Sequence, residues 1–156
     1  MKRWTLVVLI AACLSGRGNA ADAGKTQDAT AEFRPRVEKV LAAWATLDPS
    51  KAAAYYAKDP DLVFFDIAPL KYTGWKDYEA GFRQTVADWK SLKLTLGPDF
   101  KAYSSGNVAW ATYTVSFEIE PRSGDTMRGE ARGTGIFEKR GDGWLIIHEH
   151  VSAPMQ

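Results

Sequence analysis

The strongest constraint on the fold is a change in hydrophobic period near Trp89. Before Trp89, apolar residues recur every three or four positions, as they do along one face of a helix. After it, apolar and polar residues alternate in four segments separated by turn-forming residues, at about 91–103, 107–120, 126–139 and 143–152. Helices followed by a strand meander predict an α+β fold, with the helices on one side of an antiparallel sheet.

The part of the chain before this change predicts three helices and one short strand. Apolar side chains at helical spacing place the start of the first helix near Ala31. The pair Asp48-Pro49 is typical of an N-cap followed by a first-turn proline. The expected elements are a first helix carrying Phe33, Val37, Val40, Leu41 and Trp44, a second helix over roughly 49–57, a strand over 62–66 and a third helix over about 75–89.

The N-terminus predicts export. Lys2 and Arg3 precede an apolar run that is too short to span a bilayer as a helix, which is typical of a signal peptide over residues 1–20. A polar stretch, residues 21–30, reads as a flexible leader before a single domain over 31–156. We expect a periplasmic or secreted protein, and the alternative is a lipoprotein anchored through Cys13.

Charge and cysteine content exclude several kinds of site. Removing residues 1–20 takes three basic residues and no acid, so the net charge falls from +1 to about −2. Nucleic acid, which is bound through a concentrated basic face, is therefore not an expected partner. Cys13 is the only cysteine, so the domain has no disulfide and no thiol nucleophile. About 125 residues suit one domain with one core.

Strand alternation assigns side chains to the two faces of the sheet. The segment 107–120 places Tyr113, Val115 and Phe117 on one face, which must cover the core and face the helices. The segment 126–139 carries mostly small residues on one face, including Gly129, Gly133 and Gly135. Glycine weakens a strand and marks a bend or a close approach. Two interpretations stay open: the small residues leave room for a ligand, or they let the sheet curl and the first helix sit close.

The last segment holds the only two histidines. Alternation places Glu149 toward the helices, and His148 and His150 on the opposite face. We expect no metal, because no further histidine or cysteine supplies a third ligand. A polar network of His148, His150 and Ser152 with Arg132 and Thr134 is favoured. Four apolar side chains should share this outer face and predict a homodimer: Trp110, Ile136, Trp144 and Ile146.

Five stretches together resemble a known family. They are YYAKDPDLVFFD (55–66), YTGW (72–75), GNVAW (106–110), RGT (132–134) and GWLIIHEHVS (143–152). In order and spacing, across residues 31–154, they resemble the SnoaL-like and ketosteroid-isomerase-like members of the nuclear transport factor 2-like superfamily. This resemblance implies a cone-like curved antiparallel sheet with three N-terminal helices that enclose a pocket.

The resemblance to ketosteroid isomerase also implies site residues. Asp66, eight residues before Gly74, matches the general base of that enzyme. The two positions of its oxyanion hole fall near Val40 and near Gly133 or Gly135, which have no side-chain donor, so steroid isomerisation by that mechanism is not expected. With the aromatic wall implied by the same likeness, the expected ligand-binding residues are Trp44, Tyr56, Tyr72, Phe82, Tyr113, Val115, Phe117 and Glu149.

Three functions are compatible with these residues. The first is an exported small-molecule-binding domain whose pocket takes a small apolar or aromatic molecule without a cofactor. The second is an isomerase, cyclase or dehydratase that uses Asp66 as a general base. The third is an interaction domain that dimerises through the outer face of the sheet. The fold cannot choose among them, because it hosts many unrelated functions.

Overall fold

The computed structural model describes residues 25–67 and 69–154 of the 156-residue chain. The predicted signal peptide, Cys13 and the first part of the leader lie outside the described residues. Helical elements are α1 (Thr30–Trp44), α2 (Pro49–Ala52), the 3-10 turn η1 (Ala53–Tyr55) and α3 (Gly74–Thr85). Strands are β1 (Gln27–Asp28), β2 (Val63–Phe65), β3 (Tyr72–Thr73), β4 (Trp89–Leu96), β5 (Lys101–Ser105), β6 (Val108–Pro121), β7 (Met127–Arg140) and β8 (Gly143–Ser152).

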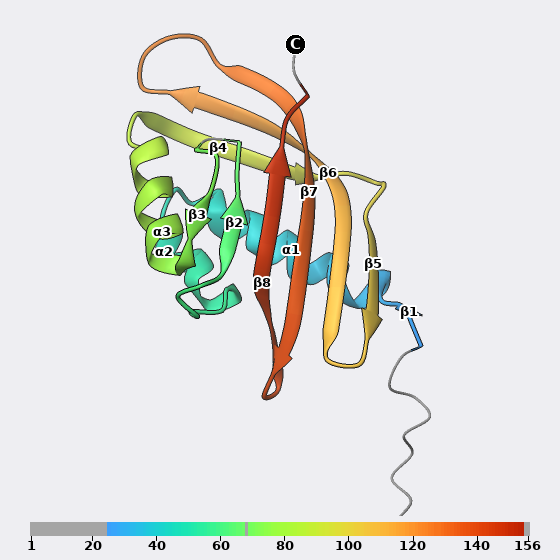
Figure 1. The fold of residues 1–156 in the computed structure, drawn as a ribbon. Helices are drawn as coiled ribbons and strands as arrows, with labels where there is room; N and C mark the ends of the chain where they lie inside the picture. Colours follow the sequence, from blue (N-terminus) through green and yellow to red (C-terminus); the bar gives the residue numbers. More distant parts are fainter. Residues whose placement is uncertain (1–24, 68, 155–156) are drawn as a thin grey trace, which may run out of the picture.

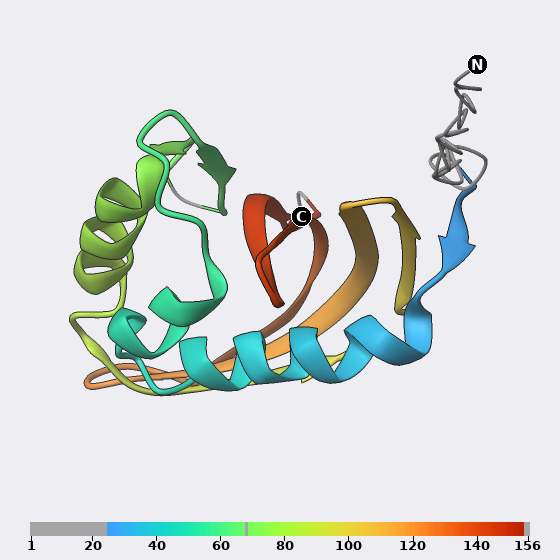
Figure 2. The ribbon, with the colours of Figure 1, turned by 90° about the horizontal axis from the view of Figure 1, so that it is seen from below.

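The strands form one curved sheet. Their order is β1-β5-β6-β7-β8-β2-β3, and β4 pairs with β6 beyond the end of β5. Neighbouring strands are antiparallel except β2 and β8, which run parallel with Phe64 opposite Glu149. Figure 1 shows long, bent β6 and β7, with α1 crossing one face of the sheet, and Figure 2 shows α1 running along the curled sheet toward α3. The predicted α+β class and the curved antiparallel sheet are confirmed.

α1 is held on the sheet by its apolar stripe. Phe33 is fully buried, and its ring centroid lies 5.0 Å from that of Phe137 on β7 and 5.1 Å from that of Trp144 on β8. Burying an aromatic side chain of this size stabilises the fold by about 1.5–3 kcal/mol. The whole predicted stripe is buried: Phe33, Val37, Val40, Leu41 and Trp44.

The other helices begin where the sequence predicts and end earlier. The Asp48 side chain accepts a hydrogen bond from the Ser50 amide and caps α2. Gly74 opens α3 with φ at +71°, and a Cβ there would lie 3.0 Å from the Pro60 carbonyl oxygen, so the position favours glycine. α3 ends at Thr85 because β4 begins at Trp89. Among the described residues, no helix is long and apolar enough to cross a membrane.

The segment expected as one strand over 91–103 is two strands. β4 and β5 both pair with β6, and the chain between them turns away at Gly97-Pro98. There the Gly97 amide donates to the Thr114 carbonyl, while the Asp99 carboxylate accepts from the Thr114 amide and hydroxyl. A proline has no amide to donate, so it interrupts a strand at this point.

A bulge in β8 changes the predicted faces of its first half. Ile136 lies opposite His148, but Phe137 lies opposite Ile146, so one extra residue is inserted in β8. Trp144 and Ile146, expected on the outer face, therefore pack toward the core beside α1. Beyond the bulge the prediction holds, because Glu149 is buried and His150 is exposed.

The end of the predicted leader is part of the sheet. Gln27 and Asp28 form β1, which pairs with Ser104 and Tyr103 of β5. The Asp28 carboxylate accepts a hydrogen bond from the Thr30 amide at the start of α1. Residues 27 and 28, which the sequence analysis assigned to the leader, therefore belong to the folded domain.

Candidate functional site

Glu149 is the buried carboxyl group at the centre of the fold. It lies on β8 between Gly135 of β7 and Phe64 of β2, and only 5% of its surface is exposed. Tyr56 donates a hydrogen bond of 2.6 Å to Oε2, and Tyr78 donates one of 3.3 Å to the same oxygen. Tyr113 donates to Oε1 over 3.4 Å. Three hydroxyls, one from the residue after η1, one from α3 and one from β6, thus satisfy a carboxyl group that would otherwise be very costly to bury.

An aromatic cluster surrounds this carboxyl group. Together with Glu149 these residues form the Glu149 cluster: Trp44, Tyr56, Tyr72, Tyr78, Phe82 and Tyr113. The Trp44 indole donates from Nε1 to the Tyr56 hydroxyl over 2.9 Å, so Tyr56 both accepts and donates. The Trp44 ring centroid lies 4.4 Å from that of Phe82, and the Tyr72 and Tyr78 rings stack at 4.8 Å. These distances are those of aromatic rings in mutual contact.

Burial sets the protonation of this group. It raises the pKa of Glu149 to about 7, the charge of Asp66 acts in the same direction, and the tyrosine hydrogen bonds act against both. Burial and the nearby Glu149 charge also raise the pKa values of Tyr56, Tyr78 and Tyr113, so all three keep their protons. Glu149 is therefore a carboxyl group that exchanges a proton near neutral pH.

Asp66 follows β2 and lies at the edge of an open pocket. Its side chain is half-buried, and Oδ1 accepts a hydrogen bond of 2.7 Å from the Ile67 amide. Burial raises the pKa of the Asp66 carboxyl group, and the Ile67 hydrogen bond partly opposes this. A raised pKa makes the carboxylate of Asp66 a stronger proton acceptor than a fully solvated aspartate.

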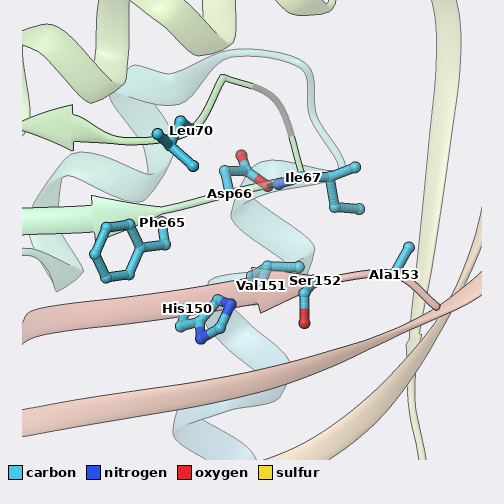
Figure 3. A pocket seen from close by; sticks show the side chains of 8 residues that line it. All are labelled: Phe65, Asp66, Ile67, Leu70, His150, Val151, Ser152 and Ala153. Atoms are coloured by element: carbon cyan, nitrogen blue, oxygen red, sulfur yellow. Dashed lines mark hydrogen bonds between the residues drawn. The ribbon is translucent and has the colours of Figure 1, made fainter. Parts of the chain in front are cut away.

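The pocket beside Asp66 has a volume of about 320 Å³. Figure 3 shows that one wall comes from the end of β2 and the loop after it, and the other from the end of β8. Its polar side chains are Asp66, His150 and Ser152. The remaining lining residues are apolar: Phe65, Ile67, Leu70, Val151 and Ala153.

The structure separates the predicted site residues into two groups. Among the predicted site residues, Asp66 alone lines this pocket, whereas the other eight lie around Glu149 or in the adjoining core. Val151 connects the groups, because it lines the pocket and also packs against the core. The residues expected to bind ligand that lie in the core are Trp44, Tyr56, Tyr72, Phe82, Tyr113, Val115, Phe117 and Glu149.

The glycine-rich face of β7 is covered by aromatic rings. A Cβ on Gly133 would lie 2.5 Å from the ring of Tyr113, and one on Gly129 would lie 2.6 Å from that of Phe117. The space over these two glycines is thus taken by side chains of the neighbouring strand β6. A second cavity, of about 270 Å³, lies between α1 and β4.

Tyr78 is a member of the Glu149 cluster that the sequence reasoning did not single out. It lies one helical turn before Phe82 on the buried face of α3. A buried tyrosine normally finds a hydrogen-bond partner for its hydroxyl, so this spacing could have suggested a polar group in the core. Tyr56, one of the expected ligand-binding residues, donates to Glu149.

The two histidines lie on the outer side of β8. His148 Nδ1 lies 2.7 Å from the Val63 carbonyl oxygen, and the ring of Phe65 contacts both imidazoles edge to face. In the expected polar network, Arg132 donates to the Ser152 hydroxyl over 3.1 Å. Within residues 25–67 and 69–154, no group of three or more potential metal ligands is found.

Sequence comparison agrees with this architecture. The profile of the SnoaL-like domain family matches residues 35–156. The chain belongs to the SnoaL-like family. No curated protein sequence matches it significantly. In this SnoaL-like domain, Val40 and Gly133 are buried against the core and offer no side-chain donor, as expected from the comparison with ketosteroid isomerase.

Solved structures share the nuclear transport factor 2-like fold. A superfamily protein from Salmonella enterica serovar Typhimurium superposes with a TM-score of 0.73 at 22% identity, over 81% of this chain and 92% of that one. A protein of unknown function from Pseudomonas putida KT2440 gives 0.69 at 26% identity, over 82% and 88%. A proposed calcium/calmodulin-dependent protein kinase II association domain from Xanthomonas campestris gives 0.61 at 25%, over 80% and 87%.

Proposed function

We propose that this SnoaL-like domain binds a small, largely apolar molecule in the pocket between the ends of β2 and β8. The observation that carries the proposal is the composition of that pocket, in which five apolar side chains surround Asp66, His150 and Ser152. Small-molecule sites have this form, a mostly apolar concavity with a few polar groups that orient the ligand. A volume of about 320 Å³ suits a compact ligand.

The Glu149 cluster supports this pocket from behind. Phe64 precedes the pocket residue Phe65 in β2 and is fully buried. Its ring stacks on that of Tyr78, with 5.2 Å between the ring centroids. Val151, two residues after Glu149, forms part of the pocket wall. A rigid wall reduces the cost of ordering the site when a ligand binds. The aromatic residues that were expected to line the site would thus affect ligand binding indirectly, by holding this wall in place.

Native mass spectrometry tests this proposal on the full chain purified from its own source, where we expect a retained small molecule. Ser152→Phe, which fills the pocket, should abolish retention. Ser116→Phe, on exposed β6 surface away from the pocket, should leave retention unchanged. Equal retention by the wild type and Ser152→Phe, with the variant folded, would place the ligand elsewhere and reject the proposal.

A second function, base catalysis, is favoured by the environment of Asp66. Burial raises the pKa of this carboxyl group, which makes the carboxylate a better proton acceptor. In such a reaction an Asp66 oxygen takes a proton from a carbon acid, and the electron pair of the C–H bond moves into the substrate. The same pocket would then hold the substrate of an isomerase, cyclase or dehydratase.

Asp66→Asn distinguishes these two functions for a neutral substrate. Asparagine keeps the shape of the side chain and loses the proton acceptor, so an enzyme should lose turnover and retain substrate affinity. Turnover that survives Asp66→Asn would exclude Asp66 as the base.

A further inference from the structure

The carboxylate of Asp66 has no basic partner in the described part of the chain. The Asp66 carboxylate accepts a hydrogen bond from the backbone amide of the next residue, Ile67. The ion pairs found among residues 25–67 and 69–154 all involve other carboxylates. A half-buried carboxylate without a cation is unfavourable, because burial removes hydration that no opposite charge replaces.

The side chains around this carboxylate are apolar and unusually exposed. Ile67 is 55% exposed and Leu70 is 88% exposed, although both are large aliphatic residues. Phe65 presents an aromatic ring on the same side of the pocket. Exposed apolar residues that gather at one concavity mark a binding site more often than chance surface positions do.

Charge and apolar surface together define a class of ligand. We infer that the pocket binds a protonated amine that carries a compact apolar or aromatic group. The ammonium group pairs with Asp66, and the apolar group lies against Phe65, Ile67 and Leu70. This inference rests on the proposed binding function and names its ligand class.

The lining of the pocket also argues against an anionic ligand. No lysine or arginine lines it, so an anion would place a second negative charge beside Asp66 with neither of these cations to balance it. The aromatic face of Phe65 favours a nearby cation and does not favour an anion. A neutral ligand of the same shape gains the apolar contacts but leaves the carboxylate unpaired.

Three probes of matched shape test the inference: phenethylamine, 2-phenylethanol and phenylacetate. At about pH 8 Asp66 is ionised and the amine is protonated. Titrations followed by the NMR signals of the Ile67 and Val151 amides should show the amine binding about tenfold or more tighter than the alcohol. Phenylacetate should bind more weakly than either.

Two variants locate the effect. Asp66→Asn should remove the preference for the amine while the alcohol still binds, which also shows that the variant is folded. Asp142→Asn is the matched control, because Asp142 is an exposed carboxylate in the turn between β7 and β8, at the opposite end of β8 from the pocket. It should leave the tenfold preference unchanged.

The Glu149 carboxyl group offers a second measurement. The charge of Asp66 contributes to its raised pKa, so an ammonium group paired with Asp66 should lower the pKa of Glu149. The side-chain carbon signal of Glu149 should then titrate at a lower pH with phenethylamine than with 2-phenylethanol.

The outcomes separate the two proposals. If wild-type protein binds 2-phenylethanol as tightly as phenethylamine at this pocket, the amine preference is wrong and the binding function stands. If none of the three probes shifts the signals of the pocket residues, both the amine inference and the proposed pocket fail. A preference for the amine that survives Asp66→Asn would also overturn the inference.

Discussion

At the scale of single residues, Glu149 is a carboxyl group that the described part of the chain buries in its core. Its pKa is about 7 in the folded protein and 4.5 is the ordinary value, so the folded state holds the proton more tightly. The stability that this provides is fully present below pH 4.5 and is lost as the pH rises through 7. The loss amounts to about 3 kcal/mol over this interval.

Glu149→Gln should remove the loss of stability between pH 4.5 and 7. The amide stays neutral at every pH in the interval and can still bond to the hydroxyls of Tyr56 and Tyr113. Chemical denaturation should therefore show the wild type losing stability from pH 4.5 to 7 and the variant changing less, and the variant should be the more stable protein above pH 7. Glu130→Gln, at an exposed position on β7, should follow the wild type. Parallel curves for Glu149→Gln and wild type would mean that Glu149 stays charged in the fold.

The candidate site was only partly predictable from single residues. Alternation in β8 placed Glu149 inward, and two of its tyrosine partners, Tyr56 and Tyr113, were expected in the same site as Glu149. The contact with Tyr78 was not anticipated, because a tyrosine at helical spacing looks like ordinary core. The wall that faces Asp66, formed by His150 and Ser152, depends on the parallel pairing of β2 with β8, and this pairing leaves no local pattern in the sequence.

At the scale of elements, the long strands were predictable and the bulge in β8 was not. The run from Gly143 to Ser152 alternates or is apolar throughout, so a one-residue insertion leaves no gap in the pattern. The break between β4 and β5 did have a signal, the Gly97-Pro98 pair. Proline at that position should have ended the predicted strand.

The two glycines at the centre of β7 provide a test of packing at this scale. Replacing glycine by alanine in a strand normally stabilises the folded state, because alanine loses less backbone freedom than glycine when the chain folds. A Cβ on Gly133, however, would lie 2.5 Å from the buried Tyr113 ring, whereas on Gly135 it would lie 3.3 Å from Phe137. Gly133→Ala should cost about 1–3 kcal/mol and Gly135→Ala clearly less. Thermal denaturation checks both, and an unchanged melting temperature for Gly133→Ala would show that the Tyr113 ring can move freely.

At the scale of the whole molecule, export remains a prediction from the N-terminus. We expect the mature chain to begin at Ala21, after removal of residues 1–20. Intact-mass measurement of the protein from a bacterial host would identify the first residue, and Cys13→Ser should leave its mass and location unchanged. A lipid-modified chain that begins at Cys13 would establish the lipoprotein alternative, and a chain that begins at Met1 would exclude export.

The homodimer also remains a prediction, and the structure changes its basis. Trp144 and Ile146 turn inward, but Trp110 and Ile136 stay on the outer face as directly paired neighbours. The Tyr103 ring lies tilted beside that of Trp110, with 5.9 Å between the ring centroids, and His148 lies opposite Ile136. A half-buried tryptophan inside such a row is typical of the centre of an interface.

Trp110→Glu tests this interface. A stable dimer buries about 800 Å² on each partner, and a carboxylate at its centre would be desolvated without a cation. Sedimentation equilibrium at micromolar concentration should give a dimer for the wild type and a monomer for Trp110→Glu. Gln84→Glu adds the same charge to an exposed position of α3, outside this face of the sheet, and should stay dimeric. A wild-type chain that sediments as a monomer would show that this row of side chains faces solvent.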